Sequence, residues 1–315
     1  MSASRPFAFL LPRGLSACSV SSLRTCTPTP CFTNKHLRQS STASARRSSP
    51  SKWLGESKER IGKCLKFGTD KEQTQEAADM LATLGREWRQ LVAGGEGFVT
   101  RPGGEGMLRQ RVVWGDMDSM SHVNNVAYNR YAESGRIEWI QHMARFIASH
   151  KKASWNAMWT PKGDGLILKT IRTDFKFVRA SNLPPNVQIA DLGKPMTWPD
   201  HVSVYHRITE KMHDLGEDPE HSVNSFKLQV LILSEKHQRP AAKCSEEIVF
   251  YDYQKKKPRP LYPFMIEAFD KLHAEQESAE RSAIEKMNEL DARILQLEKQ
   301  TWDREDAVED MGGSR

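Results

Sequence analysis

The sequence predicts an α+β fold in which one long central helix is wrapped by a mostly antiparallel sheet of about five strands. Two observations predict it. Apolar residues recur at helical spacing over residues 122–147. Four later segments alternate apolar and polar residues, as half-buried strands do. Because one short strand candidate precedes the helix and four follow it, we expect a single sheet packed on the helix, with helical extensions at both ends of the chain.

The first 55 residues are basic and are expected to lie outside the folded part. They hold eight Lys or Arg and no Asp or Glu. An Arg-rich, Ser-rich start without acidic residues is typical of a mitochondrial transit peptide, so we expect residues 1–55 to direct import into the mitochondrial matrix. A secretory signal is disfavoured because the apolar run 7–11 is short and Pro12 ends it. A disordered basic tail is a further alternative.

Charge and cysteine content exclude several classes of protein. The formal charge of +6 belongs to the leader, because 38 basic residues face 40 acidic ones in the rest of the chain. The folded part therefore gives no reason to expect nucleic-acid binding. No apolar run approaches the ~18 residues of a membrane span. Of five cysteines only Cys64 and Cys244 follow the leader, and their spacing predicts neither a disulfide framework nor a metal site.

Helical extensions are expected on both sides of the central domain. In the N-terminal extension, residues 56–106, apolar positions recur at helical spacing over 70–92 and three glycines follow. This helix is expected to pack on the central domain, with partner binding as an alternative. The C-terminal segment 263–315 reads as a charged helix and tail. Its sparse heptad, from Ile284 to Leu297, fits either a short coiled coil or a solvated terminal helix.

The central domain is expected to span residues 107–262. A short strand over 108–114 leads into a polar, turn-like segment at 115–121 and then into the long helix. On a helical wheel that helix has a broad apolar arc, which predicts burial against a sheet. The four later strands are expected in the period-two segments 167–177, 202–208, 226–232 and 248–253.

The segment from Trp114 to Glu133 carries the most informative motif. It reads Asp-x-Asp at 116–118 and His-Val-Asn-Asn at 122–125, followed by Tyr128, Tyr131 and Glu133. It resembles the hotdog thioesterases of the 4-hydroxybenzoyl-CoA thioesterase type and, at His-Val-Asn-Asn, the plant acyl-ACP thioesterases. The resemblance covers about residues 107–255. It implies a single hotdog domain, an acyl-CoA or acyl carrier protein thioester as substrate, and a homodimer or tetramer with interface active sites. No cofactor or metal is expected.

Elementary chemistry agrees with that resemblance. Thioester hydrolysis needs an activated water or a nucleophile, together with donors for the oxyanion. A helix N-terminus supplies free backbone amides and a positive dipole end. Here a helix expected to begin near Asn124 follows the acidic loop directly. The resemblance implies Asp118 as the catalytic carboxylate, acting as nucleophile or general base, and the Asn125 backbone N–H as the oxyanion donor.

The remaining motif residues have weaker expected roles. Asp116 is expected to cap the helix rather than to catalyse. His122 is a candidate to orient or protonate a group, or only to form hydrogen bonds in the loop. Asn124 and Tyr128 are candidates for binding the substrate or its oxyanion, although Asn at such a position more often caps a helix.

Glu133 falls on the apolar side of the predicted helix. Partial burial there should raise the pKa of its carboxyl, an environment that fits a catalytic acid or a substrate-orienting group. It lies about 12 Å along the helix from Asn125, so it should serve another part of the pocket or act across a dimer interface. A salt bridge to Arg130 or Arg136 is the alternative.

Two residues depart from the family pattern. Ser121 stands where Gly is common, and Met120 stands where the plant enzymes carry Asn. These departures keep open a non-catalytic hotdog module in a mitochondrial assembly. A hotdog dehydratase is a third hypothesis, but no matching signature is present. The basic cluster 255–259 is expected to be solvated, with contact to CoA phosphates as the alternative.

Overall fold

The computed structural model describes residues 49–101, 106–160, 163–176, 195–215 and 223–309. Almost all of the predicted leader lies outside these residues. The N-terminal extension starts earlier than expected, because helix α1 (Pro50–Lys66) covers the last part of the segment 1–55. Pro50 occupies the first turn of α1, where a missing backbone N–H costs no hydrogen bond.

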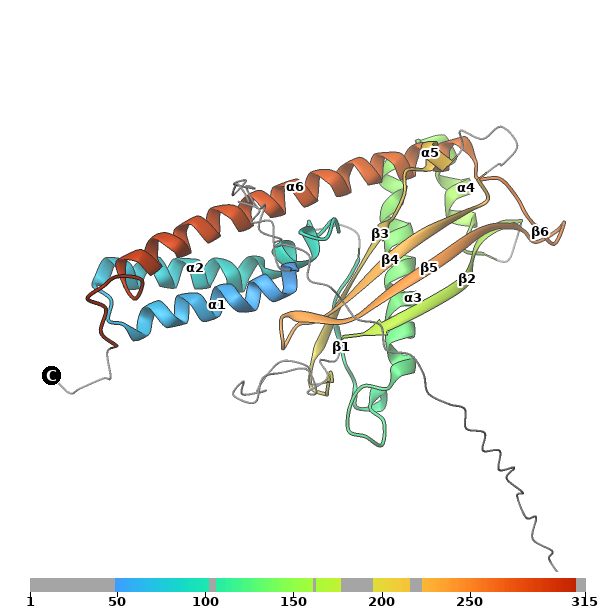
Figure 1. The fold of residues 1–315 in the computed structure, drawn as a ribbon. Coiled ribbons are helices and arrows are strands. Elements are labelled where there is room, and N and C mark those ends of the chain that lie inside the picture. Colours follow the sequence, from blue (N-terminus) through green and yellow to red (C-terminus); the bar gives the residue numbers. More distant parts are fainter. Residues whose placement is uncertain (1–48, 102–105, 161–162, 177–194, 216–222, 310–315) are drawn as a thin grey trace, which may run out of the picture. The chain divides into compact units, whose positions relative to one another are not determined.

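The central sheet confirms the predicted architecture. Its strands pair in the order β1-β3-β4-β5-β2, all antiparallel, and a short sixth strand pairs with β5. Figure 1 shows the long helix α3 (Asn125–Met143) lying across the sheet. The strands are β1 (Gly106–Arg111), β2 (Asp164–Phe175), β3 (His201–Ile208), β4 (Ser225–Ser234), β5 (Arg239–Asp252) and β6 (Lys257–Pro258).

Close packing joins α3 to β3. At Gly135 an added Cβ would lie 2.8 Å from Val204 Cγ1 and 3.1 Å from His206 Cε1, so only glycine allows this approach. The predicted apolar arc of α3 is buried at Tyr131 and Trp139. One side of this arc is less buried than expected, because the sheet covers a narrower part of the helix surface than the apolar arc occupies. Two residues on that side are exposed: Val126 (64%) and Ile137 (38%).

The helical extensions form a second core on the other face of the sheet. Helices α1, α2 (Lys71–Arg89) and α6 (Pro263–Gln300) share one apolar cluster with sheet residues Tyr205 and Leu231. The expectation of a solvated terminal helix is therefore wrong, because Leu290 and Ile294 of α6 are fully buried against α1 and α2. Packing of the extension on the central domain is confirmed.

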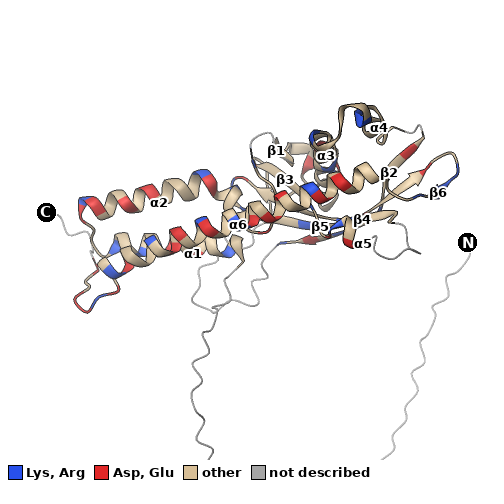
Figure 2. Cartoon of the chain, turned by 90° about the horizontal axis from the view of Figure 1, so that it is seen from above, with Lys and Arg blue, Asp and Glu red and all other residues tan. Residues whose placement is uncertain are grey.

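Charge distribution and helix starts fit this packing. Figure 2 shows Lys and Arg interspersed with Asp and Glu along α1, α2 and α6. Asp70 caps α2, and Gln73 completes a reciprocal capping box. Two short helices, α4 (Lys152–Ala157) and α5 (Met212–Leu215), lie in the connections. Within the described ranges, no helix has the length and apolar character needed to cross a membrane.

Candidate active site

The acidic loop is a small hairpin in front of α3. Asp118 N donates to His122 O (2.9 Å), Asn124 N donates to Asp116 O (2.8 Å), and Met117 pairs with Val123 between them. Because side chains alternate along paired segments, Asp118 and His122 share the face opposite the buried Val123.

The tip of this hairpin explains one departure from the family pattern. Ser121 has φ +63°, a left-handed conformation that glycine adopts without steric cost. Its amide donates to Asp118 O at 3.1 Å, which closes the turn. A serine here keeps the hairpin geometry that a glycine would adopt more easily.

The structure brings Asp118 and His122 together. Asp118 Oδ1 lies 3.5 Å from His122 Nδ1 and accepts a 2.8 Å hydrogen bond from Met120 N. Their side chains are 26% and 34% exposed, so water reaches both groups. Such a carboxylate can orient or accept a proton from an imidazole or a water. Met120 contributes its backbone amide, while its side chain is exposed.

Asp116 holds the hairpin against α3. Its buried carboxylate accepts hydrogen bonds from Val113 N (3.0 Å), Arg130 Nη2 (2.7 Å) and Tyr131 Oη (2.7 Å). Asp116 is thus structural, but the expectation that it caps the helix is wrong: its carboxylate binds two α3 side chains, and Asn124 caps α3 instead. Burial, and next the bond to Asp116, raise the pKa of Tyr131 well above its usual value.

The N-terminus of α3 leaves one amide available. Asn124 Oδ1 caps the helix by accepting from Val126 N at 3.0 Å. The N–H of Asn125 has no hydrogen-bond partner among the described residues, and Asn125 is exposed. A free N–H at the positive end of a helix dipole is a suitable donor for an oxyanion.

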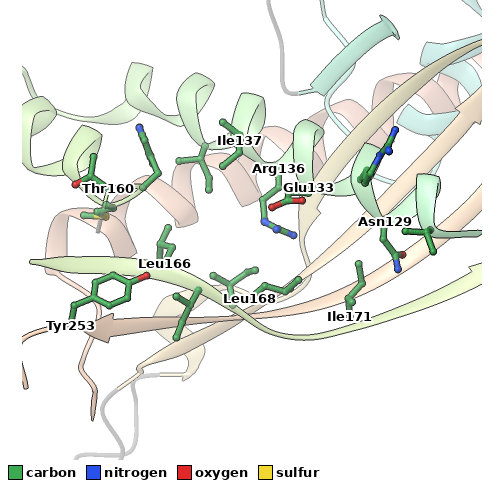
Figure 3. A pocket seen from close by; sticks show the side chains of 16 residues that line it. Asn129, Glu133, Arg136, Ile137, Thr160, Leu166, Leu168, Ile171 and Tyr253 are labelled. Atoms are coloured by element: carbon green, nitrogen blue, oxygen red, sulfur yellow. The ribbon is translucent and has the colours of Figure 1, made fainter. Parts of the chain in front are cut away.

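A cavity of about 600 Å³ lies between α3 and β2. Figure 3 shows Asn129, Glu133 and Arg136 on α3 facing Leu168 and Ile171 of β2. Most of its other lining residues are apolar: Val126, Ile137, Ile140, Met158, Trp159, Leu166, Ile167, Ile248 and Tyr253.

The cavity follows the helix for much of its length. Val126, in the first turn of α3, marks one end, and Ile140 lies near the other. This separation corresponds to about 21 Å along the helix axis. The cavity therefore starts next to the free amide and continues as an apolar groove.

Glu133 lies in this cavity, but its expected burial is wrong. The side chain is exposed, because β2 does not close against this side of α3 and leaves the cavity open there. The alternative salt bridge is also absent: Arg130 binds Asp116, and Arg136 binds Glu246. Glu133 thus remains a group that can contact a ligand.

Tyr128 does not reach the cavity. It is fully buried among apolar side chains and packs edge-to-face on Phe175, with ring centroids 5.3 Å apart. Burial raises the pKa of its hydroxyl to about 12. The expected substrate-binding role is contradicted by this placement, because the ring belongs to the core beneath the hairpin.

The predicted residues thus lie in separate places. Asp118 and His122 lie on the hairpin, and Glu133 lies in the cavity; Asn124 and Asn125 stand between them at the start of α3. None of Asp118, His122, Asn124 and Asn125 lines the cavity of the single chain. Across the described residues, no group of three His, Cys, Asp or Glu side chains is placed to hold a metal ion.

Sequence reasoning missed the opposite wall of the cavity. Leu166 and Leu168 on β2, together with Tyr253 after β5, face α3 only because β2 pairs with β5 at the edge of the sheet. The period-two pattern could have placed Leu166 and Leu168 on one strand face. The sequence suggests Glu133 as a partner of Arg136, whereas its partner in the structure, Glu246, lies 110 residues later.

Comparisons with known proteins agree with this fold. A family model described as "Thioesterase-like superfamily" matches residues 112–269. No curated protein sequence matches the chain.

Several solved structures are similar. One is a thioesterase from Thermus thermophilus complexed with coenzyme A and Zn, with 18% identity, a TM-score of 0.37, and coverage of 55% of this chain and 98% of that chain. Another is a DHNA-CoA thioesterase from Staphylococcus aureus, with 16% identity, a TM-score of 0.36, and coverage of 53% and 90%. A 1,4-dihydroxy-2-naphthoyl-CoA thioesterase from Synechocystis has 16% identity, a TM-score of 0.35, and coverage of 51% and 91%.

Proposed function

Because the chain belongs to the thioesterase-like superfamily, we propose that it hydrolyses acyl thioesters of CoA or of acyl carrier protein. The observation that carries this proposal is the free Asn125 amide between the Asp118–His122 pair and the head of an apolar cavity. These parts correspond to the activated water, the oxyanion donor and the acyl site that the reaction needs.

In the proposed mechanism Asp118 acts as general base. Its carboxylate takes a proton from a water molecule, whose oxygen attacks the thioester carbonyl carbon. The Asn125 N–H donates to the oxyanion that forms on the carbonyl oxygen. When the C–S bond breaks, the leaving thiolate takes up the proton, delivered by Asp118 directly or through His122, which lies 3.5 Å away. The products are a free carboxylic acid and a thiol.

The cavity is proposed to hold the acyl chain. Its mostly apolar walls favour burial of hydrocarbon, which contributes roughly 0.8 kcal/mol per CH₂ group. Glu133 and Arg136 add a polar zone partway along the groove. We therefore expect chain length to affect KM more than kcat, because the chain contacts are the same before and during the reaction.

A second subunit is proposed to complete the site. β2 is an edge strand with an unpaired side, and Trp114 (72%) and Met120 (70%) beside the hairpin are exposed. Long unpaired edges and clustered exposed apolar side chains are surfaces that subunits commonly cover. This supports the homodimer or tetramer expected from the sequence, and a subunit that covered Met120 would lie beside Asp118.

The decisive experiment measures thiol release from a panel of acyl-CoA and acyl carrier protein substrates. Asp118→Asn should lower kcat by about 10²–10⁴-fold, while Asp79→Asn, at an exposed position on α2, should leave it unchanged. Equal rates for wild type and Asp118→Asn on every active substrate would exclude Asp118 as the catalytic carboxylate.

The non-catalytic module remains the second candidate, because Asp118 and His122 lie outside the cavity of the single chain. It predicts no thiol release from any substrate by a folded wild-type protein. Location in the mitochondrial matrix is proposed from the composition of the leader alone. Fusing residues 1–55 to a fluorescent protein tests it: import must depend on the membrane potential and be lost when the Arg and Lys residues are replaced by Gln.

A further inference from the structure

A second cavity, of about 490 Å³, lies where α2 meets the sheet. Its walls come from the last turns of α2, the bulged part of β1, the start of β3 and the turn between β4 and β5. Figure 1 shows the end of α2 approaching the sheet. Four of its lining side chains are cationic: Arg86, Arg89, Arg109 and Lys236.

The two acidic groups in the cavity are already occupied. The Glu235 carboxylate pairs with Arg89 at 2.5 Å and also accepts from Ser203 Oγ. The Asp200 carboxylate accepts from His201 N (2.6 Å), Lys236 N (2.9 Å) and Ser234 Oγ (2.5 Å).

Three cationic side chains in the cavity consequently have no anionic partner among the described residues. The side chains of Arg86, Arg109 and Lys236 make no hydrogen bond or ion pair with any other described residue. Three unpaired cations around one hollow create a field that attracts an anion with several negative oxygens.

Arg109 is held in this cavity by its backbone. The pairing of β1 with β3 is irregular between Met107 and Gln110, and Arg109 has φ +52°, which L residues rarely adopt. Its amide donates to Ser203 Oγ at 3.2 Å, and Ser203 is bound to Glu235. The series of side-chain interactions from Arg89 through Glu235 to Ser203 thus fixes the backbone of Arg109. Strained backbone conformations of this kind concentrate at binding sites.

An exposed aromatic pair adjoins the cationic cavity. Trp198 directly precedes Pro199, which lines the cavity, and its ring centroid lies 5.6 Å from that of Trp114. Both rings are exposed, Trp198 by 46%. Nucleobases stack on such rings, whereas Arg and Lys bind phosphate oxygens. Together they match a phosphorylated nucleotide better than an acidic protein surface, which would need no hollow of this size.

The cavity and the candidate active site share one connecting segment. β1 ends at Arg111 and continues through Trp114 into the hairpin that carries Asp118. Val112 N donates to Asp200 O at 3.0 Å, which fixes this segment to the wall of the cavity. A CoA thioester has a long flexible arm between its nucleotide and its reactive carbon, so its two ends bind at separate places.

We propose that this cavity binds the phosphorylated nucleotide of CoA, with Arg86, Arg109 and Lys236 on phosphate oxygens and Trp198 against the adenine. The proposal rests on the proposed function and narrows its substrate to CoA thioesters. Arg86 and Arg109 precede the matched residues 112–269, so segments outside the family region supply two of the three cations. The helical extension would then be part of the substrate site.

Calorimetric titration of the full chain with adenosine 3′,5′-bisphosphate tests the site without requiring activity. The cavity variant combines Arg86→Gln, Arg109→Asn and Lys236→Gln; Asn is chosen at 109 because it tolerates positive φ. The matched control combines Lys256→Asn, Lys257→Gln and Arg281→Gln. Lys256 also has φ +52°, so both variants lose three charges and change one strained position.

The control also tests the basic cluster 255–259. It lies at the opposite end of β5 from the cationic cavity, about 43 Å away along the strand. We expect the Kd for adenosine 3′,5′-bisphosphate to rise at least about tenfold in the cavity variant, since each lost charged contact weakens binding by roughly that factor. The control variant should bind within twofold of wild type. Adenine stacked on Trp198 should quench tryptophan fluorescence when the nucleotide binds. Trp198→Ala should weaken binding and reduce this quenching.

Several results would overturn the proposal: no binding by folded wild type, equal loss in both triple variants, or binding of inorganic phosphate as tight as that of the bisphosphate. The single variant Arg86→Gln, at an exposed helix position, guards against misfolding of the triple and should still raise Kd. Failure of hydrolysis with nucleotide binding intact would refute only the proposed function. Acyl-CoA hydrolysis with an unchanged KM in the cavity variant would refute only this site.

Discussion

The guanidinium of Arg136 lies 2.7 Å from the carboxylate of Glu246 and connects the open face of α3 to the interior of β5. The Glu246 side chain is fully buried, whereas Arg136 is 11% exposed and lines the cavity between α3 and β2. Glu246 Oε2 has no hydrogen-bond partner in the described part of the chain. The pair therefore holds a buried negative charge behind the cavity, and Arg136 is what neutralises it.

Arg136→Met should destabilise the fold by about 3–5 kcal/mol, because it leaves the Glu246 charge buried and unpaired. The double variant Arg136→Met/Glu246→Met should recover most of that loss. Urea unfolding at pH 7 measures both. Burial raises the pKa of Glu246, and loss of the Arg136 charge should raise it further. The single variant's deficit should shrink as the pH falls through that raised pKa. A single variant within 1 kcal/mol of wild type would contradict this account.

His206 should make stability fall in mild acid. Burial, and next the charge of Arg136, lower the pKa of its ring to about 3 from 6.5. The folded state stays neutral while the unfolded chain takes up a proton, so this contribution is complete above pH 6.5 and is lost as the pH falls toward 3. Between pH 6.5 and 5 it amounts to about 2 kcal/mol. Urea unfolding at pH 7 and pH 5 measures this effect. Between these two pH values the free energy of unfolding should fall less in His206→Leu than in wild type, by that amount. Equal falls in the two proteins would exclude this role of His206.

Alanine should have opposite effects at two helical glycines. At Gly135 the new Cβ would lie 2.8 Å from Val204 Cγ1, and overpacking of this kind costs about 1–3 kcal/mol. At Gly62 of α1 nothing lies within 4 Å, so Gly62→Ala should stabilise by about 0.5–1 kcal/mol through helix propensity. Thermal unfolding of the two variants compares them directly. A stabilising Gly135→Ala would mean that α3 and β3 are not in close contact.

The two hairpin aspartates should separate stability from activity. Asp116→Asn weakens the bonds to Arg130 and Tyr131 and should cost about 1–3 kcal/mol. Asp118→Asn should stay within about 0.5 kcal/mol of wild type, because the side chain is partly exposed and can still accept from Met120 N. Urea unfolding of both variants alongside thiol release completes the comparison. A large stability loss in Asp118→Asn would undermine its use as a test of catalysis.

The order of elements could be predicted from the sequence because periodicity records local burial. Tyr131 and Trp139 fall on one helical face and are buried as expected. Val126 and Ile137 look equally apolar, yet they line a cavity. The difference depends on how far β2 extends over α3, which is set by its pairing with β5 and not by α3 itself.

Contacts between distant segments account for the other failures. The apolar stripe of α6 indicates one buried face, but its partners α1 and α2 lie about two hundred residues earlier in the chain, so a solvated helix looked equally reasonable. The sequence predicts burial of Glu133 because its neighbours on the helical wheel are apolar. The cationic cavity draws on four separate segments, and no local pattern marks such a convergence.

Helix α6 belongs to both hydrophobic cores at once. Its first turns place Met265 and Phe269 beside Trp139 of α3, and its last turns place Leu290 and Ile294 among the helices of the extension. Because this one helix, about 57 Å long, contributes side chains to both cores, neither core is complete without it. Melting either one would strip a wall from the other, so both should unfold in one cooperative transition. A fragment trimmed to residues 112–269 would keep only seven residues of this helix and would also lack β1.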